Sequence, residues 1–112
     1  MKSKRILLSP PHMGGTELTY IAQAFQDNWI APIGPHITLF ENRLADFLGE
    51  NTQVAALQSG TAAIHLGLQL LGVQNGDEVL CQSLTFVASV NPILYLGATP
   101  IFVGSEKETW NM

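Results

Sequence analysis

The sequence predicts an α/β domain built around a parallel sheet. Three short apolar segments, at residues 53–57, 78–82 and 98–103, have the length and composition of strands. Segments with a helical pattern separate them, at residues 61–71 and 85–96. Strands that alternate with helices along a chain are typical of βαβ units, in which the strands run parallel. Apolar residues make up 46% of the 112-residue chain, which is enough to form a core and disfavours disorder.

Two amphipathic helices are predicted ahead of the first strand. Residues 6–15 contain a Pro-Pro pair and a Gly-Gly pair, so they are expected to form a loop. Thr16 is expected to cap the first helix. The apolar positions of this helix follow the 3.6-residue period and are Leu18, Ile21, Ala22 and Phe25. The second helix is expected to end at Gly49, and its apolar face consists of Ile37, Phe40, Leu44, Phe47 and Leu48.

The loop between these two helices is a candidate binding segment. Residues 29–35 read Trp-Ile-Ala-Pro-Ile-Gly-Pro, which is apolar and is interrupted by proline and glycine. A loop of this composition has few ways to cover its side chains except against another surface. Binding residues are also common on loops that a rigid scaffold positions.

The second half of the chain carries clear signals for the ends of its elements. Gly72 is expected to end the helix at 61–71, and Gly97 the helix at 85–96. Pro92 lies inside the latter helix and removes one backbone donor, so a kink or a late helix start is expected. The segment 98–103 is apolar and β-branched enough to be a strand that is buried on both faces.

The stretch Gln58–His65 joins the first strand to the helix that follows, through the sequence Ser-Gly-Thr. A helix start presents unpaired backbone N–H groups and the positive end of the helix dipole, which suits a bound phosphate. The hydroxyl of Thr61 could donate to the same anion. The alternative is simple capping by Ser59, because serine is among the commonest N-cap residues. The turn alone favours the capping interpretation.

Composition excludes several classes of function. The net charge is −4 and no basic stripe is present, which disfavours nucleic acid as a partner. The single cysteine, Cys81, cannot form an internal disulfide and fits a reducing compartment. The apolar run behind the basic start is too short for a signal peptide, and no run approaches membrane-spanning length. A soluble, cytoplasmic protein with no membrane partner is expected.

The histidines and the cysteine are interpreted structurally. His65 is expected to be packed or partly exposed rather than catalytic, and His36 is expected near a helix start. His12 lies in the entry loop, where it could approach a substrate, although loop histidines are usually solvated. Cys81 lies in a strand and is most simply a small core residue. Three scattered histidines and one cysteine lack the spacing of metal ligands, so no metal site is expected.

Residues 104–112 follow the last strand and contain no element that would close the sheet. The chain is therefore expected to be the N-terminal part of a larger protein. Its sheet edges and apolar helix faces would lack cover in isolation. We expect the 112-residue chain alone to self-associate or to be marginally stable.

The motifs, in their order along the chain, resemble the start of a known enzyme family. They are the entry Leu8–Gly15, the loop Trp29–Pro35, the turn Ser59–Ala63, Gly76–Val79, Ser83–Asn91 and Gly97–Val103. Together they closely resemble the N-terminal third of the nucleotide-sugar aminotransferases of the DegT/DnrJ/EryC1/StrS family. The first loop looks most like members that aminate UDP-4-keto sugars for surface-glycan synthesis. Several motifs in the right order are far more specific than the Ser-Gly-Thr turn alone.

The resemblance implies a fold and a cofactor. The chain would form the N-terminal part of an aspartate-aminotransferase-like large domain (fold type I), three-layered and with a mainly parallel sheet. Residues 1–112 would then be a fragment of the pyridoxal-phosphate-binding domain. Loops and helices would occupy residues 1–52, and the strand-helix-strand-helix-strand unit would occupy residues 53–104.

The resemblance also assigns site residues. Gly60, Thr61 and the N–H of Ala62 match the cradle for the phosphate of pyridoxal phosphate. Phe86 matches the aromatic residue that stacks on the cofactor ring, whereas plain core packing is the alternative when Phe86 is considered alone. The residues assigned to the sugar-nucleotide pocket are Trp29, Ile30, Ala31, Gly34 and His12.

Two expected functional groups are absent from the chain. In the family, the Schiff-base lysine and the aspartate that faces the pyridine nitrogen lie beyond the matched segment. The lysines here are Lys2, Lys4 and Lys107, and none stands in a matching context. No catalytic residue is therefore assigned, and the chain alone is expected to be inactive. A smaller departure is Gly104, where the family usually has aspartate.

Two functional interpretations follow from the resemblance. In the first, the chain is part of a homodimeric aminotransferase that moves an amino group from glutamate to a 4-keto nucleotide sugar, for polysaccharide or glycoprotein glycan synthesis. In the second, it is a catalytically inactive, truncated remnant that acts as a ligand-binding or dimerisation module. A structural or regulatory domain without a ligand is a third alternative.

Overall fold

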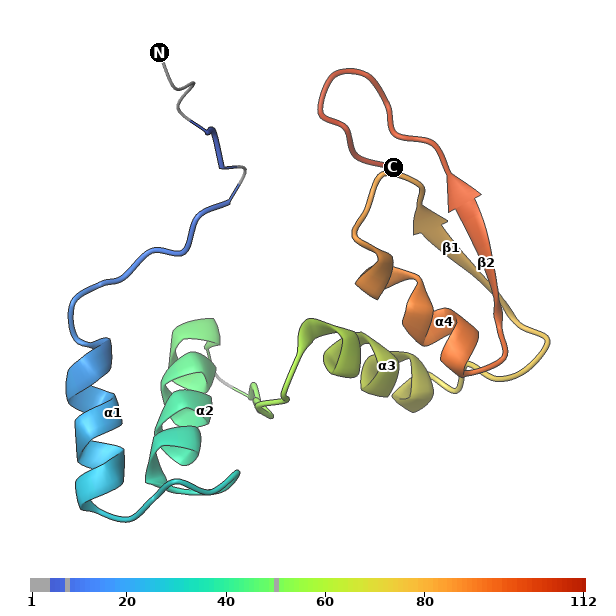
Figure 1. Ribbon diagram of the computed structural model, residues 1–112. Coiled ribbons are helices and arrows are strands. Elements are labelled where there is room, and N and C mark those ends of the chain that lie inside the picture. Colours follow the sequence, from blue (N-terminus) through green and yellow to red (C-terminus); the bar gives the residue numbers. More distant parts are fainter. Residues whose placement is uncertain (1–4, 8, 50) are drawn as a thin grey trace. The chain divides into compact units, whose positions relative to one another are not determined.

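The structure, a computed structural model, describes residues 5–7, 9–49 and 51–112 (Figure 1). The chain divides into two compact units, Met1–Val54 and Ala55–Met112. The first unit carries two helices, and the second carries two helices, a short 3-10 helix and a two-stranded sheet.

The entry loop and helix α1 (Glu17–Gln26) begin as expected, but Thr16 does not cap the helix with its side chain. Thr16 occupies the N-cap position with φ −103° and ψ −7°, which is a helical conformation. A capping side chain normally requires an extended backbone at that residue. The Glu17 carboxylate instead accepts hydrogen bonds from the N–H groups of Gly14 and Gly15. The entry loop is thereby joined to the first turn of α1.

Helix α1 ends in a turn centred on Asn28. The N–H of Asn28 donates to the Phe25 carbonyl at 3.2 Å, and the N–H of Trp29 donates to the Ala24 carbonyl at 2.8 Å. This pair of bonds is the Schellman motif, which requires a left-handed residue at its centre. Asn28 meets that requirement with φ +58°, and asparagine tolerates this conformation better than most residues. The motif fixes the direction in which the loop 29–35 leaves the helix.

Helix α2 (Pro35–Leu48) matches the second predicted helix and stops before Gly49, as expected. Pro35 occupies the first turn, where its missing N–H has no intrahelical acceptor to lose. No residue of α1 or α2 is buried. The predicted apolar face of α2 is only partly covered: Ile37 and Leu44 are half-buried, and Phe47 is 84% exposed.

The strand expected at residues 53–57 is not formed. Residues 52–57 have no regular secondary structure, although they connect directly to the capped start of α3. A strand exists only when a neighbour accepts and donates its main-chain hydrogen bonds. The described residues provide no such neighbour at this segment, because the sheet contains only β1 and β2.

Helix α3 (Gly60–Leu70) ends in a second Schellman motif. The N–H of Gly72 donates to Gln69 and the N–H of Val73 donates to Leu68, both at 3.0 Å. Gly72 lies at φ +83°, so it supplies the left-handed residue that the sequence predicted there. Leu68 and Val73, which the motif brings together, both pack against the core.

Strands β1 (Glu78–Gln82) and β2 (Thr99–Val103) form a parallel pair, as predicted (Figure 1). The register places Leu80 beside Ile101 and Cys81 beside Phe102. The helical segment expected at 85–96 is divided into η1 (Val87–Ser89) and α4 (Asn91–Tyr95). Pro92 lies in the first turn of α4, so the late helix start is confirmed and the continuous helix is not.

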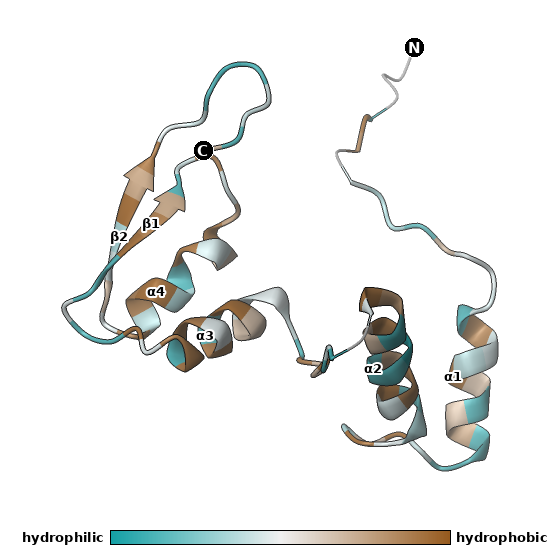
Figure 2. Ribbon diagram, turned by 180° about the vertical axis from the view of Figure 1, so that it is seen from behind, coloured by the Kyte–Doolittle hydropathy of each residue, from teal (hydrophilic) through white to brown (hydrophobic). Residues whose placement is uncertain are grey.

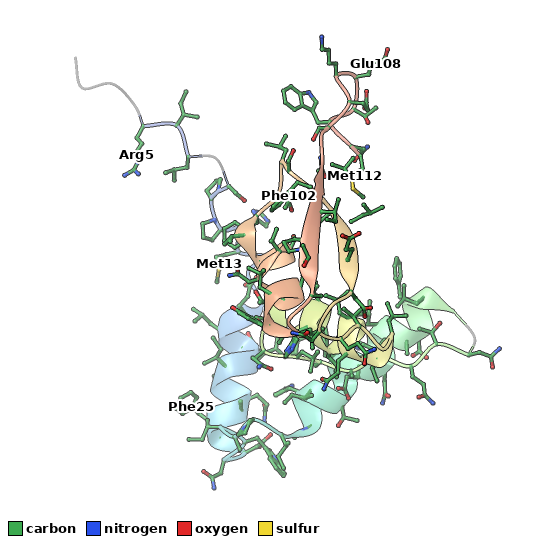
Figure 3. The ribbon with its side chains drawn as sticks, turned by 90° about the vertical axis from the view of Figure 1, so that its right-hand side faces the viewer. Arg5, Met13, Phe25, Phe102, Glu108 and Met112 are labelled. Carbon is green, nitrogen blue, oxygen red and sulfur yellow. The ribbon has the colours of Figure 1, made fainter. Side chains whose placement is uncertain are left out.

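A small core joins α4 to the sheet. Its buried apolar residues are Cys81, Ile93 and Ala98, and the buried Pro92 lies in the same helix as Ile93. Cys81 is therefore a core residue, as expected. Helix α4 contacts β2, but the expectation that β2 is buried on both faces is wrong. No β2 residue is buried, and Phe102 is 57% exposed (Figure 3). Both strands are coloured as largely apolar in Figure 2.

Candidate functional site

Ser59 caps helix α3 with its side chain. Its backbone is extended, with φ −163° and ψ 158°, and its Oγ accepts a hydrogen bond from the N–H of Ala62 at 3.1 Å. Its carbonyl accepts from the N–H of Ala63 at the same distance. The capping interpretation of this turn is therefore confirmed. The Ala62 N–H, which the resemblance assigns to a phosphate, already has an acceptor in this structure.

The other two cradle residues still offer donors at the helix start. Gly60 is exposed and Thr61 is half-buried. Among the described residues, no side chain or loop carbonyl accepts a hydrogen bond from either N–H. A Cβ placed on Gly60 would meet no atom within 4 Å, so the space above this residue is open. Two unpaired donors at the positive end of an 11-residue helix form a site that suits a phosphate.

Phe86 lies at the start of η1, four residues after β1, and is 79% exposed. Its carbonyl accepts from the N–H of Ser89 at 2.9 Å, and the hydroxyl of Thr85 donates to the Ser89 Oγ at 3.0 Å. These local hydrogen bonds hold the backbone of this segment, while most of the Phe86 ring is accessible to solvent. The core-packing alternative for Phe86 is therefore wrong in this structure.

Helix α3 contacts both η1 and α4, so the phosphate turn and the segment with Phe86 belong to one packed unit. The rings of His65 and Tyr95 meet edge to face, with centroids 5.8 Å apart and planes at 85°. His65 is half-buried. The expectation of a packed, partly exposed histidine is confirmed, and its ring helps to join α3 to α4.

The residues expected to contact a sugar nucleotide lie in the first unit. Trp29 is placed by the turn at the end of α1, and its ring covers Gly34: a Cβ on Gly34 would lie 3.2 Å from Trp29 Cε3. Trp29, Ala31 and Gly34 line a small hollow beside the start of α2. Ile30 is exposed and His12 lies exposed in the entry loop. The structure thus brings Trp29, Ala31 and Gly34 together and leaves His12 and Ile30 outside this hollow.

Electrostatics support the ordering of the entry loop. Hydrogen bonds from the N–H groups of Glu17 itself, Gly14 and Gly15 lower the pKa of the Glu17 carboxyl, because they stabilise its charged form. The loop that carries His12 is therefore held to α1 by an ionised carboxylate. A Cβ on Gly14 would lie 3.1 Å from Glu17 Oε1, so glycine at this position lets the backbone approach the carboxylate closely, and Gly15 adopts φ +100°, which favours glycine.

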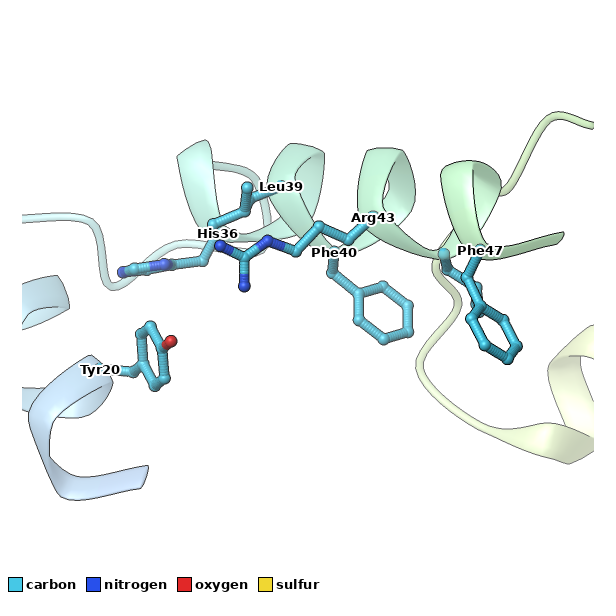
Figure 4. A pocket seen from close by; sticks show the side chains of 7 residues that line it. Tyr20, His36, Leu39, Phe40, Arg43 and Phe47 are labelled. Carbon is cyan, nitrogen blue, oxygen red and sulfur yellow. The ribbon is translucent and has the colours of Figure 1, made fainter. Parts of the chain in front are cut away.

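A larger hollow of about 540 Å³ lies on the apolar face of α2, and its lining contains none of the predicted site residues. Figure 4 shows the side chains that line it. The rings of Tyr20 and His36 meet edge to face, with their centroids 5.9 Å apart. The lining residues are Tyr20, His36, Leu39, Phe40, Arg43, Leu44 and Phe47. Phe40, Leu44 and Phe47 belong to the face that the sequence predicted as core. We interpret this hollow as an uncovered packing surface rather than a ligand site.

Within the described residues, no group of three or more histidine, cysteine or acidic side chains could hold a metal ion. No described helix is both long enough and apolar enough to cross a membrane.

Comparisons with known proteins all indicate the same family. The model of the DegT/DnrJ/EryC1/StrS aminotransferase family matches residues 11–112. The "Putative pyridoxal phosphate-dependent aminotransferase EpsN" of Bacillus subtilis (strain 168) is 59% identical over 109 residues, which cover 97% of this chain and 28% of that protein. The GDP-perosamine synthase of Escherichia coli O157:H7 is 44% identical over 110 residues, which cover 97% of this chain and 30% of the relative.

Solved structures agree with these sequence matches. The PMP-form of the "Putative sugar aminotransferase Spr1654" from Streptococcus pneumoniae matches with a TM-score of 0.83 and 34% identity. The match covers 96% of this chain and 26% of that one. The expected fold class, part of a type I aminotransferase domain, is therefore confirmed. The chain spans less than a third of the length of these relatives.

Proposed function

The chain belongs to the DegT/DnrJ/EryC1/StrS aminotransferase family, and we propose that it is the phosphate-binding part of a pyridoxal-phosphate-dependent aminotransferase. The proposed reaction transfers an amino group from glutamate to a 4-keto nucleotide sugar, in the synthesis of polysaccharide or glycoprotein glycans. The observation that carries the proposal is the start of α3, where Gly60 and Thr61 offer open donors in the same packed unit as the exposed ring of Phe86.

The residues present fit the phosphate and one face of the ring of such a cofactor. Bound pyridoxal phosphate supplies the electron sink for amino-group transfer. The N–H groups of Gly60 and Thr61, with the Thr61 hydroxyl, would hold the phosphate. The Ala62 N–H would join them if Ser59 Oγ released it. Phe86 would stack on the ring, which contributes about 0.5–1.5 kcal/mol beyond the buried area.

The loop between α1 and α2 would contact the nucleotide sugar. The ring of Trp29 packs on the backbone of Gly34, so the two ends of the apolar loop are in contact with each other. Ile30 and Ala31 are exposed in that loop and would cover the ligand. His12 would approach from the entry loop, which Glu17 ties to α1.

The proposal also covers the assembly and the location of the protein. We propose a homodimer, since the exposed apolar faces of α1 and α2 need cover. A cytoplasmic location is favoured by the single cysteine. The 112-residue chain alone would not catalyse transfer, because none of its three lysines stands in a context that matches the Schiff-base lysine. The second candidate function is an inactive module that binds a ligand or dimerises.

A chimera tests the proposed function. Residues 11–112 would replace the matched segment of the Bacillus subtilis relative, and the product would be assayed for bound cofactor and for amino transfer from glutamate to UDP-4-keto sugars. We expect a folded, cofactor-loaded, active chimera. A folded chimera that retains no cofactor would contradict the proposal and favour the inactive module.

A pair of threonine variants tests whether Thr61 contacts the phosphate of the cofactor. Thr61→Val removes one hydroxyl beside the phosphate and is expected to weaken cofactor binding by about 1.5–3 kcal/mol, the range for a hydrogen bond to a charged group. Thr19→Val makes the same change in the first turn of α1 and should leave cofactor binding unchanged. Equal effects of the two variants would show that Thr61 does not contact the phosphate.

A further inference from the structure

The backbone that carries Phe86 lies between two anchored segments. Before it, the N–H of Ser83 donates to the Val103 carbonyl at 2.9 Å, which ties the end of β1 to β2. After it, Val90 packs against the buried core. Residues 84–86 belong to no helix or strand, so the conformation of this stretch depends on other contacts.

A hydrogen bond between two side chains closes across Phe86. The hydroxyl of Thr85 donates to Ser89 Oγ at 3.0 Å, and the N–H of Ser89 donates to the Phe86 carbonyl at 2.9 Å. Thr85 precedes Phe86 and Ser89 follows it, so the side-chain bond restricts rotation about both φ and ψ of Phe86. The direction in which the ring leaves the backbone is restricted with them. Both bonds join residues at most four apart in the sequence, so they are completed within this segment.

Capping of η1 does not account for the Thr85–Ser89 bond. The N-cap residue of η1 is Phe86, which makes no side-chain cap, and the Thr85 hydroxyl donates to a side-chain oxygen. Through this bond it pairs with none of the free main-chain groups at the ends of the helical turn. Thr85 is also exposed, so water could replace the bond at little cost in folding free energy. The consequence of the bond is geometric: it holds together the residues on either side of Phe86.

We propose that Thr85 is a positioning residue for the cofactor: its hydroxyl, acting through Ser89, holds the Phe86 ring in the orientation that stacking on the cofactor ring requires. The inference rests on the proposed function, which assigns that stacking to Phe86. Aromatic rings attract each other in an offset-stacked arrangement, with their centroids about 4.5–7 Å apart. A change in the direction of the Phe86 side chain moves its ring out of that arrangement, whereas Thr85 itself needs no contact with the cofactor.

The strength of the Thr85–Ser89 bond sets the size of the expected effect. Without the bond, more conformations become accessible at Phe86, and only the fraction that presents the ring correctly can stack. The apparent dissociation constant of the cofactor rises in inverse proportion to this fraction. A hydrogen bond of ordinary net strength favours one conformation by a factor of about two to ten. Loss of the bond should therefore weaken cofactor binding by a factor in that range.

Binding of pyridoxamine phosphate to the chimera described above tests the proposal. This ligand has the ring and the phosphate of the cofactor but no aldehyde, so it binds without a covalent bond to a lysine. Thr85→Val removes the hydroxyl and keeps the size of the side chain, and it should raise the dissociation constant about two- to tenfold. Thr85→Ser keeps the hydroxyl and should bind as the parent chimera does. Thr99→Val makes the same change at the start of β2, at the other end of the parallel pair from Phe86, and should also leave binding unchanged.

A double-mutant cycle shows whether Thr85 acts through the ring. In a Phe86→Ala background there is no ring to orient, so Thr85→Val should cause no further loss of affinity. An equal loss with and without the ring, or no loss in the parent chimera, would overturn the proposal. If Phe86→Ala alone left the dissociation constant unchanged, the stacking in the proposed function would fail, and the inference with it. If Phe86→Ala weakened binding and Thr85→Val did not, only the inference would fail.

Amide exchange in the 112-residue chain, without cofactor, gives a second test. Thr85→Val should lower the protection of the Ser89 N–H, which donates to the Phe86 carbonyl, whereas Thr85→Ser should not. The N–H of Val73, in the turn that ends α3, is an internal control for global stability, and its protection should be the same in all three chains. Unchanged protection of Ser89 in Thr85→Val, or an equal decrease at Ser89 and Val73, would contradict the positioning role.

Discussion

Replacing Gly97 by alanine is expected to destabilise the second unit for two separable reasons. Gly97 ends α4 in a Schellman motif: its N–H donates to Leu94, and the N–H of Ala98 donates to Ile93 at 3.1 Å. Its φ is +73°, a conformation that costs an alanine roughly 1–2 kcal/mol. A Cβ at this position would also lie 2.7 Å from Asn75 Nδ2 and 3.3 Å from Asn75 Cβ.

The structure provides a control that isolates the cost of the left-handed backbone conformation. Gly72 has φ +83° at the equivalent position of α3, and a Cβ there would meet no atom within 4 Å. Gly72→Ala should therefore cost only the backbone term, roughly 1–2 kcal/mol. Gly97→Ala should cost about 0.5–1.5 kcal/mol more, the range for a side chain that is forced off its rotamer. The excess is expected because the side chain of Asn75 would have to move away from the new Cβ.

Urea unfolding at one fixed, low chain concentration would measure both losses, because association would otherwise add to the apparent stability. Asn75→Gly combined with Gly97→Ala should recover the steric part, which a double-mutant cycle would report as coupling. Equal losses for Gly97→Ala and Gly72→Ala, or no coupling to position 75, would refute the steric argument.

Three further predictions concern the candidate site and the entry loop. Ser59→Ala should lower the free energy of unfolding by about 1 kcal/mol because it removes the cap of α3. Ser59→Asp should keep the cap. Equal losses of stability in the two variants would contradict the role of the side-chain oxygen. The pKa of Glu17 is lowered in the folded state from its ordinary 4.5, so its stabilisation of the entry loop is present above that pH and is lost as pH falls through the lowered value. The amide protection factors of Gly14 and Gly15, which are corrected for the intrinsic pH dependence of exchange, should fall over that acid range, and Glu17→Gln should leave them independent of pH. Phe86→Leu should change the free energy of unfolding by less than about 0.5 kcal/mol because the ring is exposed. Ile93→Ala, in the core, should lower it by about 2–5 kcal/mol. A large loss of stability in Phe86→Leu would show that the Phe86 ring stabilises the fold.

Features encoded within a few neighbouring residues were predicted well. Strand β1 lies where the sequence placed it, and helices end beside Gly49, Gly72 and Gly97 as expected. Caps and left-handed turns depend on the backbone preferences of one or two residues, so a local pattern is enough to locate them. The turn centred on Asn28 was missed, although asparagine at a helix end is a recognisable signal for it.

The candidate site was predicted in part for the same reason. The order of motifs indicated the family and placed a phosphate turn at the start of α3, where the structure has open donors. The sequence could not decide between capping and anion binding by the Ala62 N–H, because that choice depends on the rotamer of Ser59. Nor could it decide whether Phe86 was core or exposed, since burial depends on what the rest of the unit packs against the ring.

By itself, the sequence determined the family and the positions of the helices and strands that local hydrogen bonds and turns define. Only the tertiary structure decided which of those elements find partners. In the described part of the chain, residues 53–57 have the composition of a strand but pair with no other strand, and β2 has the composition of a buried strand but no buried residue. The physical reason is that pairing and burial are relations between segments distant in the chain, whereas capping and turn formation are completed within a few residues.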